Sequence, residues 1–320
     1  MLARIVNLPT LCVLVAISFA TSGAFGQTAQ VAPADKAAEI SVRIPTYALQ
    51  DQVDVLSDPS RRMRMDVNVG GAGPFSFSID SGSPRSVIAT ELAEKLGLKE
   101  LSPVPIVRMA DEGMTPTVHT DRIAFGTQVL SGLQLSSVGR QGIGSDGVIG
   151  LDGLRDRRLI LDFQAQRMTV QNSKPADSSY YDNRTIVAKA QSKLGQLIIS
   201  NARLGDQPVS VVIDTGADVT IGNMALFNML KQRGLAEAPQ NVTLDLGAGR
   251  SVTAQYAVAH KLVIGLAKLD NVPIYFFDAA PFGQWELASK PSMLLGMDML
   301  RKFDLVAIDF GGRHVDFRFP

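Results

Sequence analysis

The stretch Ile79-Asp80-Ser81-Gly82 recurs later in the chain in a closely related form, Ile213-Asp214-Thr215-Gly216. In both copies the aspartate follows a run of alternating apolar residues and precedes a small hydroxyl residue and a glycine. A single Asp-Ser/Thr-Gly tripeptide is common in turns and says little by itself. The significance of the two copies therefore depends on the sequence that surrounds them.

The surroundings form an internal repeat. A proline precedes the aspartate at the same spacing in both copies, as Pro74 and Pro208. An amphipathic helix is expected after each tetrapeptide, ending at Gly97 in the first copy and at Gly234 in the second. The copies then close with two matching stretches, VIGLDGL over 148–154 and LLGMDML over 294–300.

Short alternating strands, frequent turns and few helices predict an all-β fold. Two copies in tandem predict two lobes related by a pseudo-two-fold axis, which would bring Asp80 and Asp214 face to face. The expected organisation is a signal peptide over 1–26, an N-terminal extension over 27–58, a first lobe over 59–172, a linker over 173–185 and a second lobe over 186–320.

Composition and the N-terminus narrow the classes of function. The 31 basic and 31 acidic residues cancel and form no basic stripe, so no nucleic-acid partner is expected. Arg4, the apolar run over 8–20 and the small residue Gly26 predict a signal peptide cleaved before Gln27, with an uncleaved anchor as the alternative. Export to the periplasm or the extracellular medium follows. No other apolar run reaches membrane-spanning length, so no membrane span is expected after cleavage.

Paired aspartates suit a particular chemistry. Like charges in contact resist joint ionisation, so the pair would share one proton. The ionised partner would act as general base on a water molecule, and the protonated partner would hydrogen-bond a substrate carbonyl. Gly82 and Gly216 would let the backbone turn tightly beneath the carboxylates, while Ser81 and Thr215 would hold the loops rigid. This chemistry requires neither metal nor cofactor.

The two loops differ beyond the glycine. Ser83 takes the position that Ala217 takes in the second copy. A hydrogen bond donated by Ser83 to Asp80 would favour the ionised carboxylate. The sequence therefore predicts that Asp80 has the lower pKa of the pair.

These motifs resemble those of the retropepsin-like aspartic proteases, in particular the bacterial exported aspartyl-protease-like group. The stretch DTGADVT over 214–220 is close to the family's catalytic loop, and the stretch over 294–300 is close to its hydrophobic-hydrophobic-glycine motif. The resemblance covers most of residues 60–320, once per lobe. It implies two tandem closed β-barrel lobes with short helices in one chain.

The resemblance also implies an aspartic endopeptidase, with Asp80 and Asp214 as its catalytic dyad. Such an enzyme would act as a monomer on a peptide or protein substrate. Two polar hairpins resemble the family's flaps, and their candidate residues are Asp111, Glu112 and Gly113 in the first lobe and Gly247, Ala248 and Gly249 in the second.

Alternative interpretations remain open at this point. The same scaffold would also suit a non-catalytic peptide-binding protein of the cell envelope, because a fold does not fix a function. Residues 142–147 match the G-x-G-x-x-G dinucleotide pattern but open no long helix, so we expect a structural loop. Asp152 and Asp298, in the closing motifs, are expected to cap helices. The histidines show no metal-ligand spacing: His119, His260 and His314.

Overall fold

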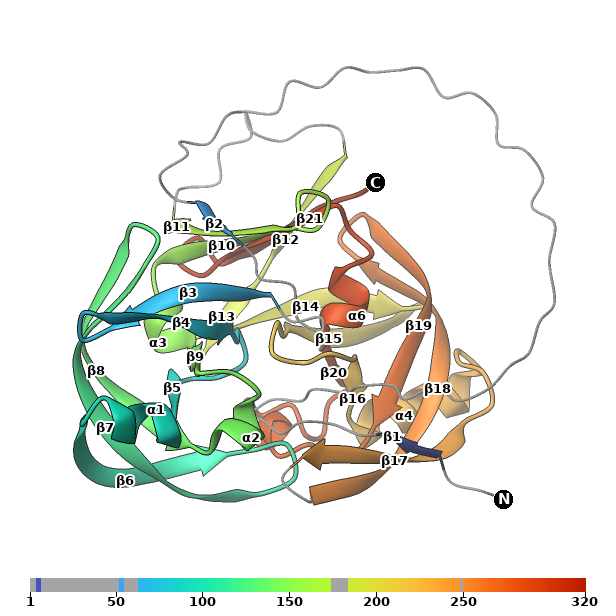
Figure 1. Cartoon of the computed structure of the whole chain (residues 1–320). Helices are drawn as coiled ribbons and strands as arrows, with labels where there is room; N and C mark the ends of the chain where they lie inside the picture. The colour runs from blue at the N-terminus through green and yellow to red at the C-terminus, as the bar shows by residue number, and fades with distance from the viewer. Residues whose placement is uncertain (1–3, 7–51, 55–62, 174–183, 248–249) are drawn as a thin grey trace, which may run out of the picture.

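The structure is a computed structural model that describes residues 4–6, 52–54, 63–173, 184–247 and 250–320. Strands dominate these residues and form three sheets, with short helices between them (Figure 1). Two of the sheets build one lobe each, and the third joins the lobes. Ala248, Gly249, most of the expected signal peptide and most of the expected extension lie outside the described residues.

The first lobe is a closed barrel. Its ring runs β3-β4-β9-β5-β8-β7 and closes where Asn68 and Val69 of β3 pair with Ala124 and Ile123 of β7. In β3 the side chains alternate between the core and solvent, as the period of a half-buried strand requires. The strands are β3 (Arg64–Val69), β4 (Ala72–Ile79), β5 (Val87–Ala89), β6 (Lys99–Val107), β7 (Glu112–Phe125), β8 (Gln128–Val138) and β9 (Gly147–Ile149).

The second lobe repeats this barrel strand for strand. Its ring runs β14-β15-β20-β16-β19-β18 and closes between residues 202–204 of β14 and residues 262–264 of β18. The prediction of two closed β-barrel lobes is thereby confirmed. The strands are β13 (Gln191–Lys193), β14 (Gln196–Leu204), β15 (Gln207–Ile213), β16 (Ile221–Gly222), β17 (Gln240–Gly247), β18 (Arg250–Ile264), β19 (Ala267–Phe276) and β20 (Ser292–Leu295).

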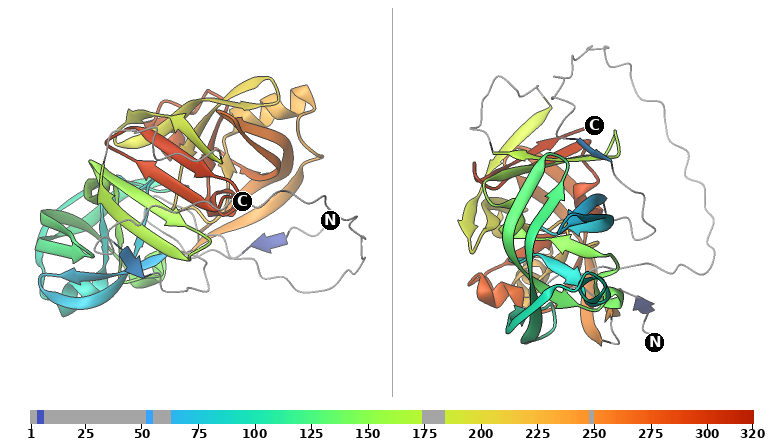
Figure 2. Two further views of the ribbon diagram at one scale, coloured as in Figure 1. Left: turned by 90° about the horizontal axis from the view of Figure 1, so that it is seen from above. Right: turned by 60° about the vertical axis from the view of Figure 1, so that its left-hand side comes forward.

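The third sheet contains strands from both halves of the chain and spans the two lobes (Figures 1 and 2). At its centre β10 pairs antiparallel with β21, so the two repeats meet in one continuous ladder. The sequence repeat did not predict that strands of the two halves share a sheet. In spatial order they are β12 (Thr185–Lys189), β22 (His314–Arg318), β21 (Leu305–Asp309), β10 (Arg157–Asp162), β11 (Arg167–Asn172) and β2 (Gln52–Asp54).

The two helices that were expected after the tetrapeptides end at or just before the expected glycines. The side chain of Asn223 accepts a hydrogen bond from the Leu226 N–H at 2.9 Å and caps α4, and Gly234 ends that helix with φ 62°. Gly97, with φ 60°, follows α1 in the same way. The helices are α1 (Thr90–Lys95), α2 (Arg140–Ile143), α3 (Leu151–Leu154), α4 (Met224–Arg233), α5 (Pro281–Gln284) and α6 (Met297–Leu300).

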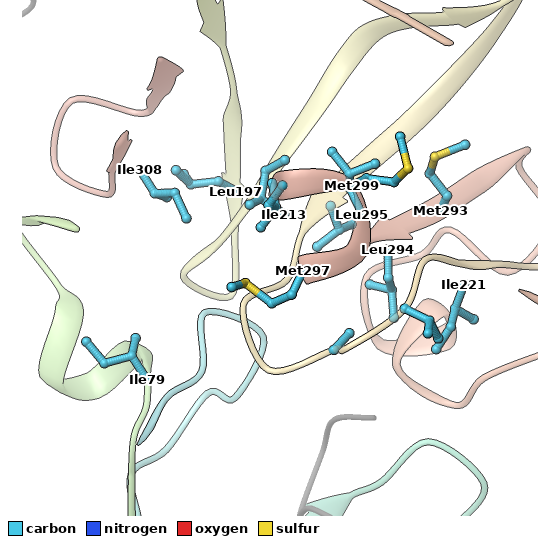
Figure 3. Packing of buried hydrophobic residues seen from close by; sticks show 14 of the residues in the cluster. Ile79, Leu197, Ile213, Ile221, Met293, Leu294, Leu295, Met297, Met299 and Ile308 are labelled. Carbon is cyan, nitrogen blue, oxygen red and sulfur yellow. The ribbon is translucent and has the colours of Figure 1, made fainter. Parts of the chain in front are cut away.

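One buried apolar cluster runs through both lobes. Ile213, Leu295 and Leu197 belong to its central part, where β14, β15 and β20 lie beside α6 (Figure 3). These fully buried side chains pack behind the loop that follows β15, so the loop is supported from below.

Among the described residues no helix is long and apolar enough to cross a membrane. A short strand, β1 (Arg4–Val6), pairs in parallel with β17.

Candidate active site

The two aspartates follow equivalent strands of the two barrels. The Asp80 N–H donates to the carbonyl of Ile149 at 3.0 Å, and the Asp214 N–H donates to the carbonyl of Leu295 at 3.1 Å. Each loop therefore leaves β4 or β15 directly beside the strand of the closing motif. Asp80 is 1% exposed and Asp214 is not exposed.

Reciprocal hydrogen bonds join the two loops across the lobes. The N–H of Ser81 donates to Thr215 Oγ1 at 2.9 Å, and the N–H of Thr215 donates to Ser81 Oγ at 2.9 Å. The same hydroxyls donate onward, Ser81 to the Ile213 carbonyl at 3.0 Å and Thr215 to the Ile79 carbonyl at 3.1 Å. Four bonds thus hold the loops against each other, in the bracing arrangement expected for Ser81 and Thr215.

The carboxylates are oriented by backbone N–H groups. Asp80 Oδ1 accepts from Gly82 at 2.9 Å and Ser83 at 3.0 Å, and Asp214 Oδ1 accepts from Gly216 at 2.9 Å and Ala217 at 3.2 Å. A Cβ atom on Gly216 would lie 2.4 Å from Asp80 Cγ. The carboxyl of Asp80 therefore lies directly on the loop of Asp214, and only glycine fits between them.

The predicted asymmetry between Asp80 and Asp214 is not supported by these contacts. Ser83 does donate to Asp80, but through its backbone N–H, as Ala217 does to Asp214. The Ser83 hydroxyl instead donates to the carbonyl of Arg85 at 2.7 Å. The side chain that distinguishes the two loops therefore gives no reason for Asp80 to have the lower pKa.

The aspartates of the closing motifs bond the loops of Asp80 and Asp214 as well as their own helices, so the prediction of helix caps describes only part of their contacts. Asp152 Oδ1 accepts from the N–H of Ser86 at 2.8 Å and from its hydroxyl at 2.6 Å. In the second lobe Asp298 accepts from the N–H of Thr220 at 3.1 Å and its hydroxyl at 2.8 Å. Each also accepts from the first turn of its own helix, Asp152 from the Gly153 N–H and Asp298 from the Met299 N–H, both at 2.8 Å. The sequence analysis did not identify Ser86 and Thr220, although their equal spacing from Asp80 and Asp214 in the two copies is a signal that could have done so.

Steric constraints explain why each closing motif contains a glycine. A Cβ on Gly150 would lie 2.6 Å from the backbone of Arg85, and one on Gly296 would lie 2.4 Å from the backbone of Val219. The loop that carries Asp80 or Asp214 therefore packs directly on this glycine in each lobe. Asp298 belongs to the same motif as Gly296. Burial raises its pKa to about 6, although the hydrogen bonds from Thr220 act in the opposite direction.

Two hairpins extend from the barrels, β6–β7 in the first lobe and β17–β18 in the second. The Arg108 N–H donates to the Asp111 carbonyl at 2.8 Å, so Asp111 lies in the turn, while Glu112 and Gly113 begin β7. Gly247 ends β17 and pairs with Arg250.

An ion pair joins the two hairpins. Arg250 Nη1 lies 2.8 Å from Asp111 Oδ2, and Arg108 Nη1 lies 2.7 Å from Asp111 Oδ1. Burial acts to raise the pKa of Asp111, but the hydrogen bonds from Arg108 and Arg250 outweigh it and hold the pKa below its ordinary value. The ionised Asp111 therefore links the tip of one hairpin to the other.

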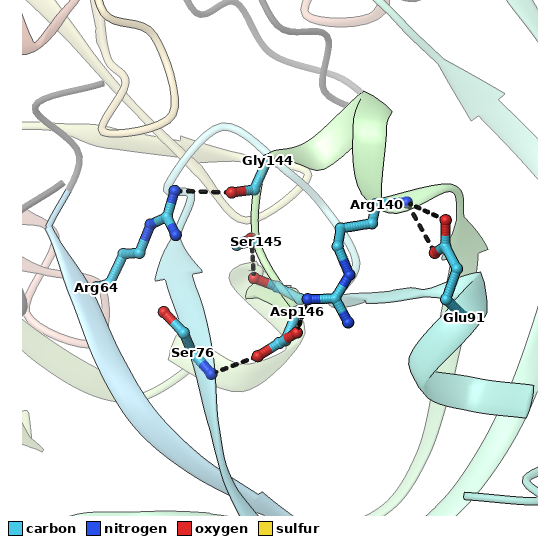
Figure 4. Close-up of polar contacts among 8 residues, drawn as sticks. Arg64, Ser76, Glu91, Arg140, Gly144, Ser145 and Asp146 are labelled. Atoms are coloured by element: carbon cyan, nitrogen blue, oxygen red, sulfur yellow. Dashed lines mark hydrogen bonds and ion pairs between the residues drawn. The ribbon is translucent and has the colours of Figure 1, made fainter. Parts of the chain in front are cut away.

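The G-x-G-x-x-G loop is built into the first lobe (Figure 4). Asp146 Oδ2 accepts from the Ser76 N–H at 2.8 Å, and Arg140 pairs with the other oxygen of the same carboxylate. Arg64 donates to the Gly144 carbonyl at 2.7 Å. These contacts agree with a structural loop.

The histidines make separate contacts. His119 contacts Asp121 at 2.9 Å on β7, and His314 lies in the shared sheet, 3.7 Å from Asp316. Within the described ranges, no group of three or more His, Cys, Asp or Glu residues forms a site that could hold a metal ion.

Two homologous barrels that present paired, cross-linked Asp-Ser/Thr-Gly loops define the bilobal aspartic protease class. The family model described as "Aspartyl protease" matches residues 65–152 and 200–299, once per lobe and over more than half of the chain. The chain belongs to this family, of the retropepsin-like type. A comparison with curated proteins gives no significant match.

Proposed function

We propose that the protein is an aspartic endopeptidase in which Asp80 and Asp214 activate one water molecule. The observation that carries this proposal is the four-bond link between the Ser81 and Thr215 loops, which holds two buried carboxyls in fixed positions. A binding protein has no need of a like-charge pair kept at such an electrostatic cost.

The chemistry follows from a pair that carries one proton. The ionised carboxylate takes a proton from water as the water oxygen bonds to the peptide carbonyl carbon, and the protonated carboxyl gives its proton to the carbonyl oxygen. The C–N bond of the resulting diol then breaks as the proton held by the first carboxyl passes to the leaving amine. One hydroxyl proton of the diol returns to the second carboxylate, which releases the carboxylic acid and restores the single shared proton. The two ionisations belong to the pair and not to either aspartate.

The test compares wild type with Asp80→Asn and Asp214→Asn on a library of end-blocked peptides across pH. Asp121→Asn, an exposed residue of β7, serves as the matched control. We expect wild type and the control to cleave, and each dyad variant to lose about 10²–10⁴-fold in rate. Peptides that bind equally to all four proteins without cleavage would favour the non-catalytic peptide-binding protein of the envelope.

The proposal includes a location and an oligomeric state. Export is supported by Arg4, the apolar run over 8–20 and the small residue at Gly26. N-terminal sequencing of the protein from its host would then begin at Gln27, and a retained Met1 would contradict export by cleavage. One chain supplies both aspartates, which supports a monomer, and sedimentation would reveal any larger species.

A further inference from the structure

A cavity of about 130 Å³ lies beside the loop of Asp80. This volume is several times the roughly 10–15 Å³ that holds one water molecule, so a side chain fits. Ser83, Pro84 and Arg85 form one wall, the end of β6 forms another, and Gln284 of α5 closes it from the second lobe. Because the Ser83 N–H also bonds Asp80, the cavity begins next to the dyad.

Arg85 gives this cavity its charge. Among the described residues that line it, Arg85 is the single charged one. Its guanidinium has five N–H donors, yet both of its side-chain hydrogen bonds come from Nη1 and are long, 3.5 Å to the Gln134 carbonyl and 3.4 Å to Gln134 Oε1. No aspartate or glutamate of the described ranges forms an ion pair with it.

The backbone that carries Arg85 is fixed. The Arg85 carbonyl accepts from the Ser83 hydroxyl at 2.7 Å, and the N–H of the following residue, Ser86, donates to Asp152. Gly150 packs directly against the Arg85 backbone. A charge on a fixed backbone loses less freedom when a ligand binds. The matching position of the second lobe is Val219, which is buried and uncharged, so the two halves of the cleft differ in charge.

We propose that Arg85 makes this cavity a specificity pocket for a carboxylate, supplied by a glutamate or aspartate side chain that flanks the cleaved peptide bond. The inference rests on the proposed peptidase function and names its substrate preference. A guanidinium recognises a carboxylate through paired, charge-assisted hydrogen bonds, and the apolar walls at Val87 and Ile106 would pack on the methylene groups. A free C-terminal carboxylate offers the same chemistry, so the test separates the two sources.

The test uses peptides that differ only by Glu, Gln or Lys at each position around the cleaved bond, each with an amidated or a free C-terminus. Wild type, Arg85→Gln, Arg85→Glu and the matched control Arg155→Gln are compared. Arg155 is exposed and lies outside the cavity. For wild type and the control we expect kcat/KM to favour Glu over Gln by about tenfold or more at one position. Arg85→Gln abolishes this preference, and Arg85→Glu shifts it toward Lys.

The outcomes separate the inference from the proposed function. Cleavage by wild type without a Glu preference overturns the carboxylate pocket and leaves the peptidase intact, and a preference confined to free C-termini overturns the side-chain assignment. If no peptide is cleaved, fluorescence anisotropy decides: tighter binding of Glu peptides that is lost in Arg85→Gln supports the pocket, and equal binding or none overturns it. Thermal unfolding of Arg85→Gln and of Arg85→Lys, which keeps the charge, shows whether the variants fold.

Discussion

At the scale of single residues, Thr215 illustrates how one hydroxyl serves both loops. It accepts from the Ser81 N–H and donates to the Ile79 carbonyl. Thr215→Val keeps the shape of the side chain but leaves both backbone groups buried without this partner, at about 1–3 kcal/mol each. We expect the free energy of unfolding to fall by roughly 2–6 kcal/mol and activity to fall with it, as urea denaturation and peptide hydrolysis would measure.

The matched control is Thr215→Ser, which retains the hydroxyl and reproduces the residue that the first loop uses at Ser81. Its stability and activity should stay close to wild type. Equal losses in the Ser and Val variants would show that the methyl group, and not the cross-lobe hydrogen bonds, holds the loops.

Ser83 gives a prediction about pH. The bond that reaches Asp80 comes from the Ser83 N–H, which Ser83→Ala retains, while the lost hydroxyl bonds the Arg85 carbonyl. We therefore expect the acid limb of the activity–pH profile to stay in place in Ser83→Ala. A clear movement of that limb would restore the interpretation in which the serine hydroxyl sets the ionisation of the dyad.

Much at this scale could be predicted because the sequence contains two copies of the same pattern. The positions of Asp80 and Asp214, and the bracing by Ser81 and Thr215, follow from matched local patterns. The hydrogen bond of the Ser83 hydroxyl could not be predicted, because the sequence does not show whether it goes to Asp80 or to the Arg85 carbonyl. The contact between Asp152 and Ser86 was missed, since the two residues are distant in sequence and become adjacent only when β9 pairs with β5.

At the scale of elements, the hairpins β6–β7 and β17–β18 are joined through Asp111. Because its pKa is lowered in the folded state, ionised Asp111 stabilises the joined hairpins at pH values above its ordinary pKa. That contribution is lost as pH falls through the lowered value. Asp111→Asn should remove it at every pH and loosen both tips.

Hydrogen–deuterium exchange of amides near 111–114 and 250–254 measures this effect. In wild type we expect protection near neutral pH that declines under strong acid, and in Asp111→Asn we expect low protection at both. Asp121→Asn, farther along β7 and facing solvent, is the control that should match wild type. Unchanged tip protection in Asp111→Asn would refute a linking role for the Arg250 contact.

The hairpins could be placed from polar, glycine-containing sequence, but only approximately. The expected first tip lay near 110–113, whereas the turn closes between Arg108 and Asp111 and strand pairing resumes at Glu112. Turn position depends on which register buries the strands, and the alternation of β6 is too irregular to fix it. The contact with Arg250 requires both lobes in place and has no local signal.

At the scale of the whole molecule, the shared sheet carries a buried charge cluster. Arg158 of β10 lies 2.6 Å from Asp316 and 3.9 Å from Asp309, and both carboxylates are buried in strands of the second half. Removing one partner of a buried ion pair costs about 3–5 kcal/mol, because the remaining charge stays in a poorly polarisable environment. Arg158→Met should lose about that much stability in urea denaturation.

Arg167→Met on the neighbouring strand β11 provides the comparison, since Arg167 is exposed. A surface arginine contributes within about 0.5 kcal/mol. If both variants lose the same stability, the cluster does not hold the lobes together.

The pairing of strands in the shared sheet could not be predicted from the sequence. Residues 158–162 of β10 pair with residues 305–309 of β21, and alternating patterns identify each strand without naming its partner. That choice depends on how two finished barrels dock. Likewise β2 and β12 join opposite edges of the sheet from segments predicted as an extension and as the boundary of a linker.

The place of β22 in that sheet has a consequence for synthesis. It lies between β12 and β21, and it follows both of them along the chain. Domains fold as they emerge from the N-terminal side, so a growing chain completes the first barrel before Asp214 has been added and long before β22 can enter the sheet. We therefore expect fragments that end before residue 314 to leave β12 and β21 without the strand that joins them, and to be less stable in urea denaturation than the full chain.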